Sequence, residues 1–206
     1  MSDGLWKKNL KPLSSLHTGS IILYPTDTIY GLGVDATDAE AVSRLRELKG
    51  RHDKKPISIV VSDIVMMEQY ALVTPLARRL VEKFLPGKLT IVLTAQEILP
   101  KELTAGTGTV GVRIPNHPVA MQLVLELGKP ITATSANVAD MPTMSTVPEI
   151  LAQFGEKALL IEKIIDVGEL PESHASTVVD ARGDVPIIVR EGAISKEALV
   201  AVARTL

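Results

Sequence analysis

Short apolar runs rich in β-branched residues alternate along this chain with segments whose apolar residues recur at helical spacing. The runs predict buried strands, and the periodic segments predict helices with one buried face. Their alternation favours an α/β fold, and 206 residues are enough for one domain with a sizeable core. Because the connections vary too much in length for regular βαβ winding, we expect an open, twisted, mixed sheet flanked by helices.

Local signals place the individual elements. A capping box formed by Thr37 and Glu40 predicts a helix over 38–49, and Gly50 stands where a glycine commonly ends a helix. Proline, glycine or hydroxyl caps bound the other expected helices, which cover 75–85, 119–127, 147–154 and the residues after Ser195. The expected strands cover 20–24, 57–61, 89–94, 110–114, 131–134, 158–161, 177–179 and 187–189. The least regular stretches are 95–109, 136–146 and 166–176, and the last is either a mobile lid or a plain surface loop.

Composition excludes several classes of function. The chain contains no cysteine, which excludes disulfide scaffolds, cysteine zinc sites, iron–sulfur clusters and thiol nucleophiles. The four histidines lack metal-ligand spacing, so we assign no protein metal site. A net charge of −2 and an aromatic content of 3% argue against a polybasic or base-stacking nucleic-acid binder. No signal peptide or transmembrane run is present, so we expect a cytoplasmic protein without membrane association.

A polar motif follows the first expected strand. In residues 24–33, YPTDTIYGLG, the hydroxyls of Thr26, Thr28 and Tyr30 accompany the carboxylate of Asp27, with glycines close by. Strand ends that open into polar loops are where α/β proteins place ligands. The alternative is a tight strand exit whose hydroxyls bond to their own turn.

A basic segment follows the first expected helix. Residues 44–55 carry six basic and two acidic side chains, a net charge of +4 in a chain of net −2. Lys49 and Arg51 flank Gly50, so an ammonium and a guanidinium could both reach one phosphate group. The alternative is a solvated basic face at the C-terminus of a helix.

Two further places combine polar side chains with buried strands. The G-x-G-x-x-G pattern at 106–111 leads into a strand rather than a helix, so it is no dinucleotide fingerprint, but Thr109 and Arg113 share one face of that strand. Arg113 either points into a cavity or pairs with a structural carboxylate. Ser135 and Asn137 end another buried strand and face one pocket or cap a turn. No nucleophile elbow accompanies Ser135.

Together these motifs resemble the YrdC-like family of threonylcarbamoyl-AMP synthases. The resemblance runs from about 19 to 192, and its order and spacing are more specific than any one motif. It is carried by YPTDTIYGLG at 24–33, K-x-R at 49–51, PGKLTIVL at 86–93, VGVRIPNHP at 110–118, S-x-N at 135–137, STVVD at 176–180 and REG at 190–192.

The resemblance implies a single YrdC-like domain over 1–206 with a deep concave cavity and no additional C-terminal domain. It implies that L-threonine, bicarbonate and ATP condense to threonylcarbamoyl-AMP with release of pyrophosphate, for a downstream transferase that modifies tRNA next to the anticodon. Mg²⁺ is expected on the phosphates, held mostly by phosphate and water. The implied nucleotide and catalytic residues are Lys49, Arg51, Ser135 and Asn137, with Thr109, Thr143 and Arg190 as further nucleotide contacts. The implied L-threonine residues are Thr26, Arg113 and Ser176, with Arg113 taking the carboxylate.

Two other functions stay open. A double-stranded RNA or tRNA-binding module could use the basic segment 44–55, although net charge and the shortage of aromatics weigh against it, which leaves at most a weak tRNA contact. A paralogue without synthase activity could keep the fold. The chain also departs from the family pattern in HDKKP after Arg51 and in His174-Ala175.

Overall fold

The structure is a computed structural model that describes residues 19–51, 55–171 and 173–203. Its strands are β1 (Ile21–Pro25), β2 (Tyr30–Gly33), β3 (Ser58–Val60), β4 (Ala71–Leu72), β5 (Leu89–Ala95), β6 (Thr109–Arg113), β7 (Ile131–Ser135), β8 (Ile161–Ile164), β9 (Thr177–Asp180) and β10 (Ile187–Arg190). Its helices are α2 (Ala39–Lys49), α3 (Ile64–Tyr70), α4 (Pro75–Phe84), α5 (Lys101–Thr104), α6 (Pro118–Leu127), α7 (Val147–Phe154), the 3₁₀ helix η2 (Gly155–Leu160) and α8 (Lys196–Ala203). None of these helices is long and apolar enough to cross a membrane.

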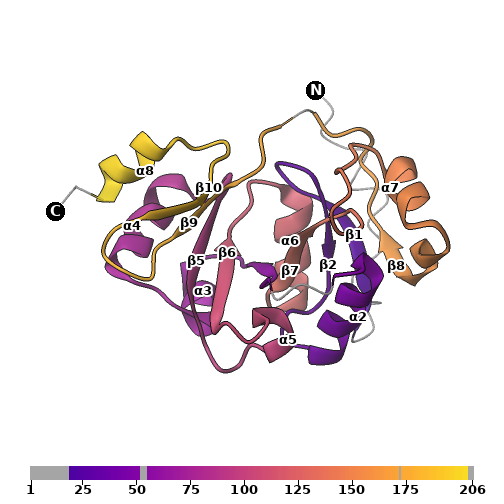
Figure 1. The fold of residues 1–206 in the computed structure, drawn as a ribbon, viewed down its shortest axis with the longest axis horizontal. Coiled ribbons are helices and arrows are strands. Elements are labelled where there is room, and N and C mark those ends of the chain that lie inside the picture. Colours follow the sequence, from indigo (N-terminus) through magenta and orange to yellow (C-terminus); the bar gives the residue numbers. More distant parts are fainter. Residues whose placement is uncertain (1–18, 52–54, 172, 204–206) are drawn as a thin grey trace.

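The strands form one mixed sheet with the order β10-β9-β5-β6-β3-β7-β2-β1-β8, and β4 pairs with β5 beside this path (Figure 1). β1 runs parallel to β8, β3 to β6 and β5 to β9, whereas the other neighbours are antiparallel. The expected α/β fold with an open, mixed sheet and flanking helices is therefore confirmed. β8 and β9 follow each other in the chain yet lie near opposite ends of the sheet, so their connection must cross it.

Helix α2 shows how local chemistry sets an element. Asp38, rather than the expected Thr37, is the N-cap: its Oδ1 accepts hydrogen bonds from the backbone N–H groups of Glu40 at 3.0 Å and Ala41 at 3.1 Å. The Thr37 hydroxyl instead donates to Asp35. Gly50 ends the helix in the left-handed conformation at φ 64°, as expected. The helix was predicted correctly, and its cap lies one residue later.

The structure of the motif at 24–33 differs from the polar loop that the sequence predicts. Residues 30–33 form strand β2, which pairs antiparallel with β1, so the turn is limited to residues 26–29. A Cβ at Gly33 would lie 2.9 Å from Cε1 of Tyr24, and one at Gly31 would lie 3.4 Å from Cζ of the same ring. The two glycines therefore make room for the buried Tyr24 ring.

Other differences concern short elements. The strand expected over 158–161 lies instead at Ile161–Ile164, directly after the 3₁₀ helix Gly155–Leu160 in the chain. Helix α3 was not predicted, and neither was the single turn α5 in the irregular stretch 95–109. Short elements give few periodic positions, so their signal in the sequence is weak.

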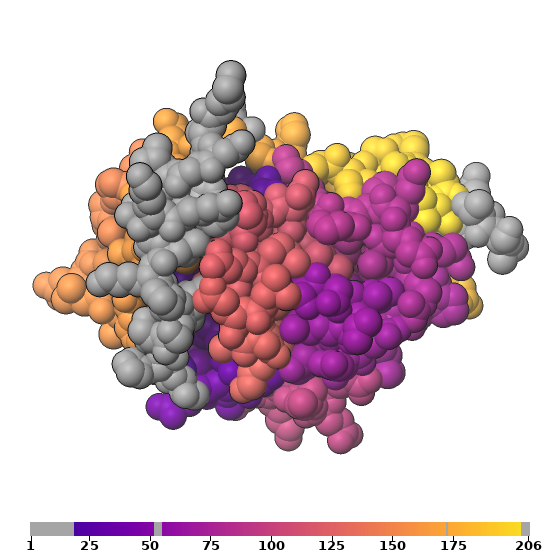
Figure 2. Space-filling model, turned by 180° about the vertical axis from the view of Figure 1, so that it is seen from behind, coloured from indigo at the N-terminus to yellow at the C-terminus, as the bar shows by residue number. Residues whose placement is uncertain are grey.

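The apolar residues form two packed clusters. The larger contains Leu23, Leu32, Ile59 and Ile91, all with no exposed area. The smaller lies under α6 and includes Val60 with the ring of Tyr24. Figure 2 shows α6 beside α3 and α4 on the face seen from behind. Packed helices thus hold the strands in place, and the polar ends of several strands are left to line cavities.

Candidate functional site

Two adjoining cavities lie among the polar strand ends. The first cavity, of about 250 Å³, is lined mainly by the β1–β2 turn and by residues of β3, β5, β6, β7, β9 and β10. The second cavity, of about 370 Å³, is lined by the end of α2 and the residues after β7. Arg51, Thr134 and Ser135 line both. A ligand in one cavity would therefore share walls with a ligand in the other.

Lys49 lies in the wall of the second cavity. Its Nζ donates hydrogen bonds to the backbone carbonyl of Ser135, to the carbonyl of Asn137 at 2.8 Å and to Oδ1 of Asn137 at 3.3 Å. The residue is only 3% exposed. Burial, with a smaller contribution from the positive charge of Arg51, lowers the pKa of Lys49 to about 7. An incoming anion would stabilise the protonated form.

Ser135 and Asn137 build the turn that carries those carbonyls. Oδ1 of Asn137 accepts a hydrogen bond from the Ser135 hydroxyl, and its Nδ2 donates to the carbonyls of Val138 at 3.0 Å and Met141 at 2.6 Å. Both residues line the second cavity. The sequence left open whether they form a turn or face a pocket, and the structure shows both. Asn137 holds the loop in shape, and Lys49 ties it to α2.

Arg113 likewise satisfies both interpretations that the sequence left open. It lines the first cavity, and its Nη2 lies 2.5 Å from Oδ1 of Asp27. Both side chains are 8% exposed. Nε of Arg113 is buried and has no hydrogen-bond partner among the described residues. An unpaired buried donor is costly, so the site favours a ligand acceptor near this guanidinium.

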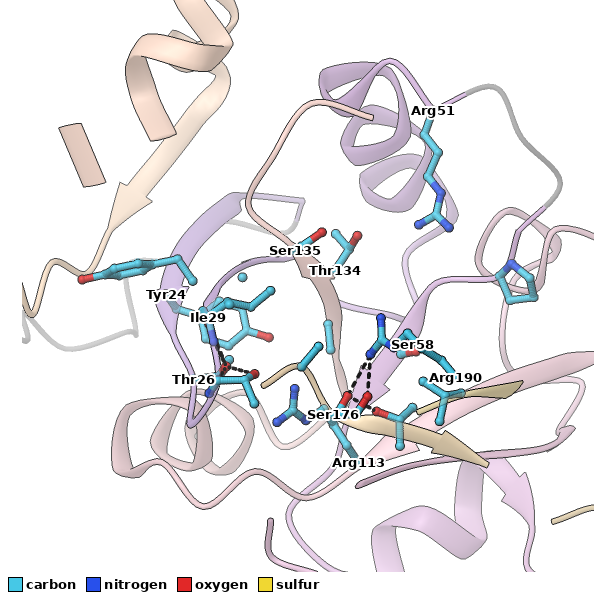
Figure 3. A pocket seen from close by; sticks show the side chains of 18 residues that line it. Tyr24, Thr26, Ile29, Arg51, Ser58, Arg113, Thr134, Ser135, Ser176 and Arg190 are labelled. Carbon is cyan, nitrogen blue, oxygen red and sulfur yellow. Dashed lines mark hydrogen bonds between the residues drawn. The ribbon is translucent and has the colours of Figure 1, made fainter. Parts of the chain in front are cut away.

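A hydrogen-bonded group that includes Arg190 and Ser176 lines another part of the first cavity (Figure 3). Nη2 of Arg190 donates to the carbonyl of Ser176 at 2.7 Å and to its hydroxyl at 3.2 Å. The Ser176 hydroxyl lies 3.0 Å from that of Thr90. Burial lowers the pKa of Arg190, and the charge of Arg113 lowers it further. Arg113 and Arg190 thus place two guanidinium groups near one another.

Thr26 shapes the β1–β2 turn. Its hydroxyl donates to the carbonyl of Ile29 at 2.7 Å and accepts from the N–H groups of Thr28 at 3.2 Å and Ile29 at 3.3 Å. Thr26 is buried and lines the first cavity, so its hydroxyl supports the turn while the residue forms part of the wall.

The predicted residues divide into two groups. Eight of them line the cavities: Lys49, Arg51, Ser135, Asn137, Arg190, Thr26, Arg113 and Ser176. Thr109 and Thr143 line neither cavity; the Thr109 hydroxyl lies 2.9 Å from that of Thr107, and Thr143 is exposed. Of the basic segment 44–55, residues 52–54 lie outside the described part of the chain, and so does most of the HDKKP departure.

Sequence reasoning missed several lining residues. Ser58 and Thr90 lie in mostly apolar strands, Thr134 lies in β7 between Thr132 and Ser135, and all three line the first cavity. A polar residue in a mostly apolar strand was the signal for Ser58 and Thr90, and the hydroxyl-rich end of β7 was the signal for Thr134. Lys55, which lines the second cavity, belonged to the basic segment but was not singled out.

The cavities are rich in positive charge. Arg51, Arg113 and Arg190 line the first cavity, and Lys49, Arg51 and Lys55 line the second. In the described ranges there is no group of three or more histidine, aspartate or glutamate residues that could hold a metal ion. Two adjoining, cation-lined cavities with several hydroxyl groups are typical of a domain that binds small anionic molecules.

Comparison with known proteins places this domain. The chain belongs to the Sua5/YciO/YrdC family, whose model, described as telomere recombination, matches residues 14–192. It is 34% identical over 189 residues to a threonylcarbamoyl-AMP synthase of Bacillus subtilis, covering 91% of this chain and 54% of the relative.

Two solved structures share the fold. The structure of Pyrococcus abyssi Sua5 complexed with L-threonine matches with a TM-score of 0.82 and 37% identity, covering 89% of this chain and 54% of that one. The structure of E. coli YciO matches with a TM-score of 0.77 and 29% identity, covering 88% and 87%. The chain thus spans about half the length of the Bacillus and Pyrococcus relatives.

Proposed function

We propose that this chain is an L-threonylcarbamoyladenylate synthase, which condenses L-threonine, bicarbonate and ATP and releases pyrophosphate. The observation that carries the proposal is the pair of cationic cavities joined through Arg51, Thr134 and Ser135. Such a pair suits two anionic substrates that react across a shared wall. The activity named for the Bacillus relative supports the same interpretation. We further propose that one domain carries both sites.

The second cavity is the proposed triphosphate site. Lys49 offers a point charge and Arg51 a two-pronged donor, and both line this cavity with Ser135 and Asn137. Thr109, Thr143 and Arg190 remain proposed further contacts to the nucleotide. Among the described residues that line the second cavity, Asp140 alone carries a carboxylate. Mg²⁺ is therefore expected to bind mainly through phosphate and water, with Asp140 as the one carboxylate near it.

The first cavity is the proposed L-threonine site. Arg113 would bind the carboxylate of the substrate, because it lines the cavity and its guanidinium is oriented by Asp27. Thr26 and Ser176 complete the proposed site from two opposite walls (Figure 3). The complex of Pyrococcus abyssi Sua5 with L-threonine is consistent with this assignment.

The chemistry needs no protein nucleophile. The amine of L-threonine attacks bicarbonate, water leaves, and a carbamate forms. A carbamate oxygen then attacks the α-phosphorus of ATP; the bond to the bridging oxygen breaks and pyrophosphate leaves. Alignment of the reactants and neutralisation of phosphate charge supply the catalysis. Lys49 and Arg51 would stabilise the negative charge that develops on the leaving group.

Pyrophosphate release tests the proposal directly. Purified protein with ATP, bicarbonate and L-threonine should release pyrophosphate, and omission of any one substrate should abolish release. Arg51→Ala should lower turnover at least about a hundredfold. Arg182→Ala is the matched control, because this half-exposed arginine pairs with Asp180 and lines neither cavity. Release that does not depend on L-threonine would contradict the proposal.

The product would go to a cytoplasmic transferase that modifies tRNA, and this partner is likewise proposed. The cationic side chains Lys49, Arg51 and Lys55 line a cavity, which suits the phosphates of one nucleotide better than a long RNA. Strong, salt-dependent tRNA binding without ATP or L-threonine would favour an RNA-binding module instead.

A further inference from the structure

The connection between β8 and β9 depends on side-chain anchors for its position. β8 and β9 lie on opposite sides of six strands in the sheet order, so residues 165–176 must cross the domain. Figure 1 shows this orange segment passing from the β1–β8 end to the β9–β10 end. Its described residues form no helix or strand. Without regular backbone pairing, bonds to neighbouring elements must hold the crossing.

Tyr30 supplies an anchor near the start of this crossing. Its hydroxyl donates to the carbonyl of Gly168 at 2.7 Å and accepts from the N–H of Val167 at 3.1 Å. The same hydroxyl lies 3.3 Å from Oδ1 of Asp166. Tyr30 is 1% exposed, whereas Val167 is 37% exposed. A buried phenol thus holds an exposed piece of backbone in place.

Tyr30 is one of the residues that line the first cavity, so the anchor joins the wall of that cavity to the crossing. Its hydroxyl has both a hydrogen-bond donor and an acceptor on the crossing. Burial raises the pKa of Tyr30, so the phenol keeps the proton that it donates to Gly168. The hydroxyl of Tyr30 therefore binds the backbone of the crossing.

Beyond Tyr30, the crossing contacts the region of the cavities at two places. The Leu170 N–H donates to the carbonyl of Ser145 at 3.1 Å, which ties the crossing to the loop that begins at Asn137. At its far end, Ala175 and Ser176 line the first cavity. The start of the crossing is therefore bound by Tyr30, a residue of the cavity wall, and its far end lines the proposed L-threonine site.

We propose that Tyr30 is a positioning residue for the L-threonine site: its hydroxyl holds the crossing 165–176 against the first cavity. The inference rests on the proposed function and adds a residue whose hydroxyl acts through the backbone of Val167 and Gly168. Tyr30→Phe keeps the ring and removes both hydrogen bonds. Without these hydrogen bonds, part of the binding free energy of L-threonine must be used to order the crossing. Binding of L-threonine is therefore weakened more than the chemical step is slowed.

The test combines kinetics with hydrogen exchange on the full chain. In Tyr30→Phe the KM for L-threonine should rise about tenfold, which corresponds to about 1.4 kcal/mol, while kcat changes less. Amide exchange in 165–171 should become at least about tenfold faster. Tyr70→Phe is the matched control, because Tyr70 is also buried but lines neither cavity. It should leave both readouts unchanged.

Several outcomes would overturn the inference. An unchanged KM for L-threonine with unchanged exchange would show that the anchor does nothing, and an equal effect of Tyr70→Phe would show only general loosening. If the wild type releases no pyrophosphate in response to L-threonine, the proposed function fails, and the role at that site fails with it. Exchange in 165–171 would still report whether Tyr30 holds the crossing.

Discussion

The lowered pKa of Lys49 makes nucleotide binding dependent on pH. Burial and the charge of Arg51 bring this pKa from 10.5 to about 7, so near neutrality about half of the free protein carries a neutral amine at this position. A triphosphate in the second cavity favours the ammonium and raises the pKa. Binding should therefore take up a proton, and the affinity for ATP should fall as the pH rises above 7.

The magnitude follows from the protonation equilibrium of this one amine. With a pKa of about 7 in the free protein, and with the ammonium retained in the complex, the protonated fraction of the free protein falls about fiftyfold between pH 7 and pH 9. The dissociation constant for ATP should rise by the same factor, or about 2 kcal/mol in binding free energy.

Isothermal titration calorimetry at several pH values, in buffers of different ionisation enthalpy, measures both affinity and proton uptake. Lys49→Met is the control variant, because it keeps a side chain of similar length without the amine; it should bind ATP more weakly and with little dependence on pH. A dissociation constant that stays constant from pH 7 to pH 9 would refute the reasoning. An equal slope in Lys49→Met would refute it as well.

The same shift affects folding, with a sign that can be checked. Between about pH 7 and pH 10 the folded state has released the Lys49 proton while the unfolded chain, with a lysine pKa near 10.5, retains it. The unfolded state then binds more protons, so this residue makes the free energy of unfolding rise with pH, by at most about 1.4 kcal/mol per pH unit. Denaturation of Lys49→Met at pH 7 and pH 9 should lack this contribution.

Three substitutions test other parts of the structure. Arg113→Lys keeps the charge but loses the planar fork, so the KM for L-threonine should rise at least about tenfold in steady-state assays; an unchanged KM would place the carboxylate elsewhere. Gly192→Ala would place a Cβ 2.2 Å from the carbonyl oxygen of Ala175 and should cost about 1–3 kcal/mol in thermal unfolding, whereas Gly183→Ala, with no atom within 4 Å, should change stability by less than about 0.5 kcal/mol. Asp38→Ala should destabilise the protein by about 1 kcal/mol in urea unfolding through loss of the α2 cap, and no loss would mean that another group satisfies those N–H groups.

Elements with strong local signals were predictable from the sequence. Helix α4 begins at Pro75 after its cap Thr74, and α6 lies between His117 and Gly128, because caps and proline act over a few residues. The longer strands were also located to within one or two residues. The cap of α2 and strand β2 were misjudged, and the packing of Gly31 and Gly33 against Tyr24 was not predicted, since each depends on a partner or a packing neighbour that local spacing does not reveal.

The sequence by itself determined the α/β class, the longer elements and most of the polar residues that line the cavities. Tertiary structure alone decided which of these residues meet. Lys49 reaches the carbonyls of Ser135 and Asn137, and Arg113 pairs with Asp27, across separations of more than eighty residues. Such contacts depend on the order and register of the strands, and burial then sets their charge state. The spacing of motifs along the chain identifies the residues of the site. The sheet sets the geometry of these residues, and the burial that results lowers the pKa of Lys49.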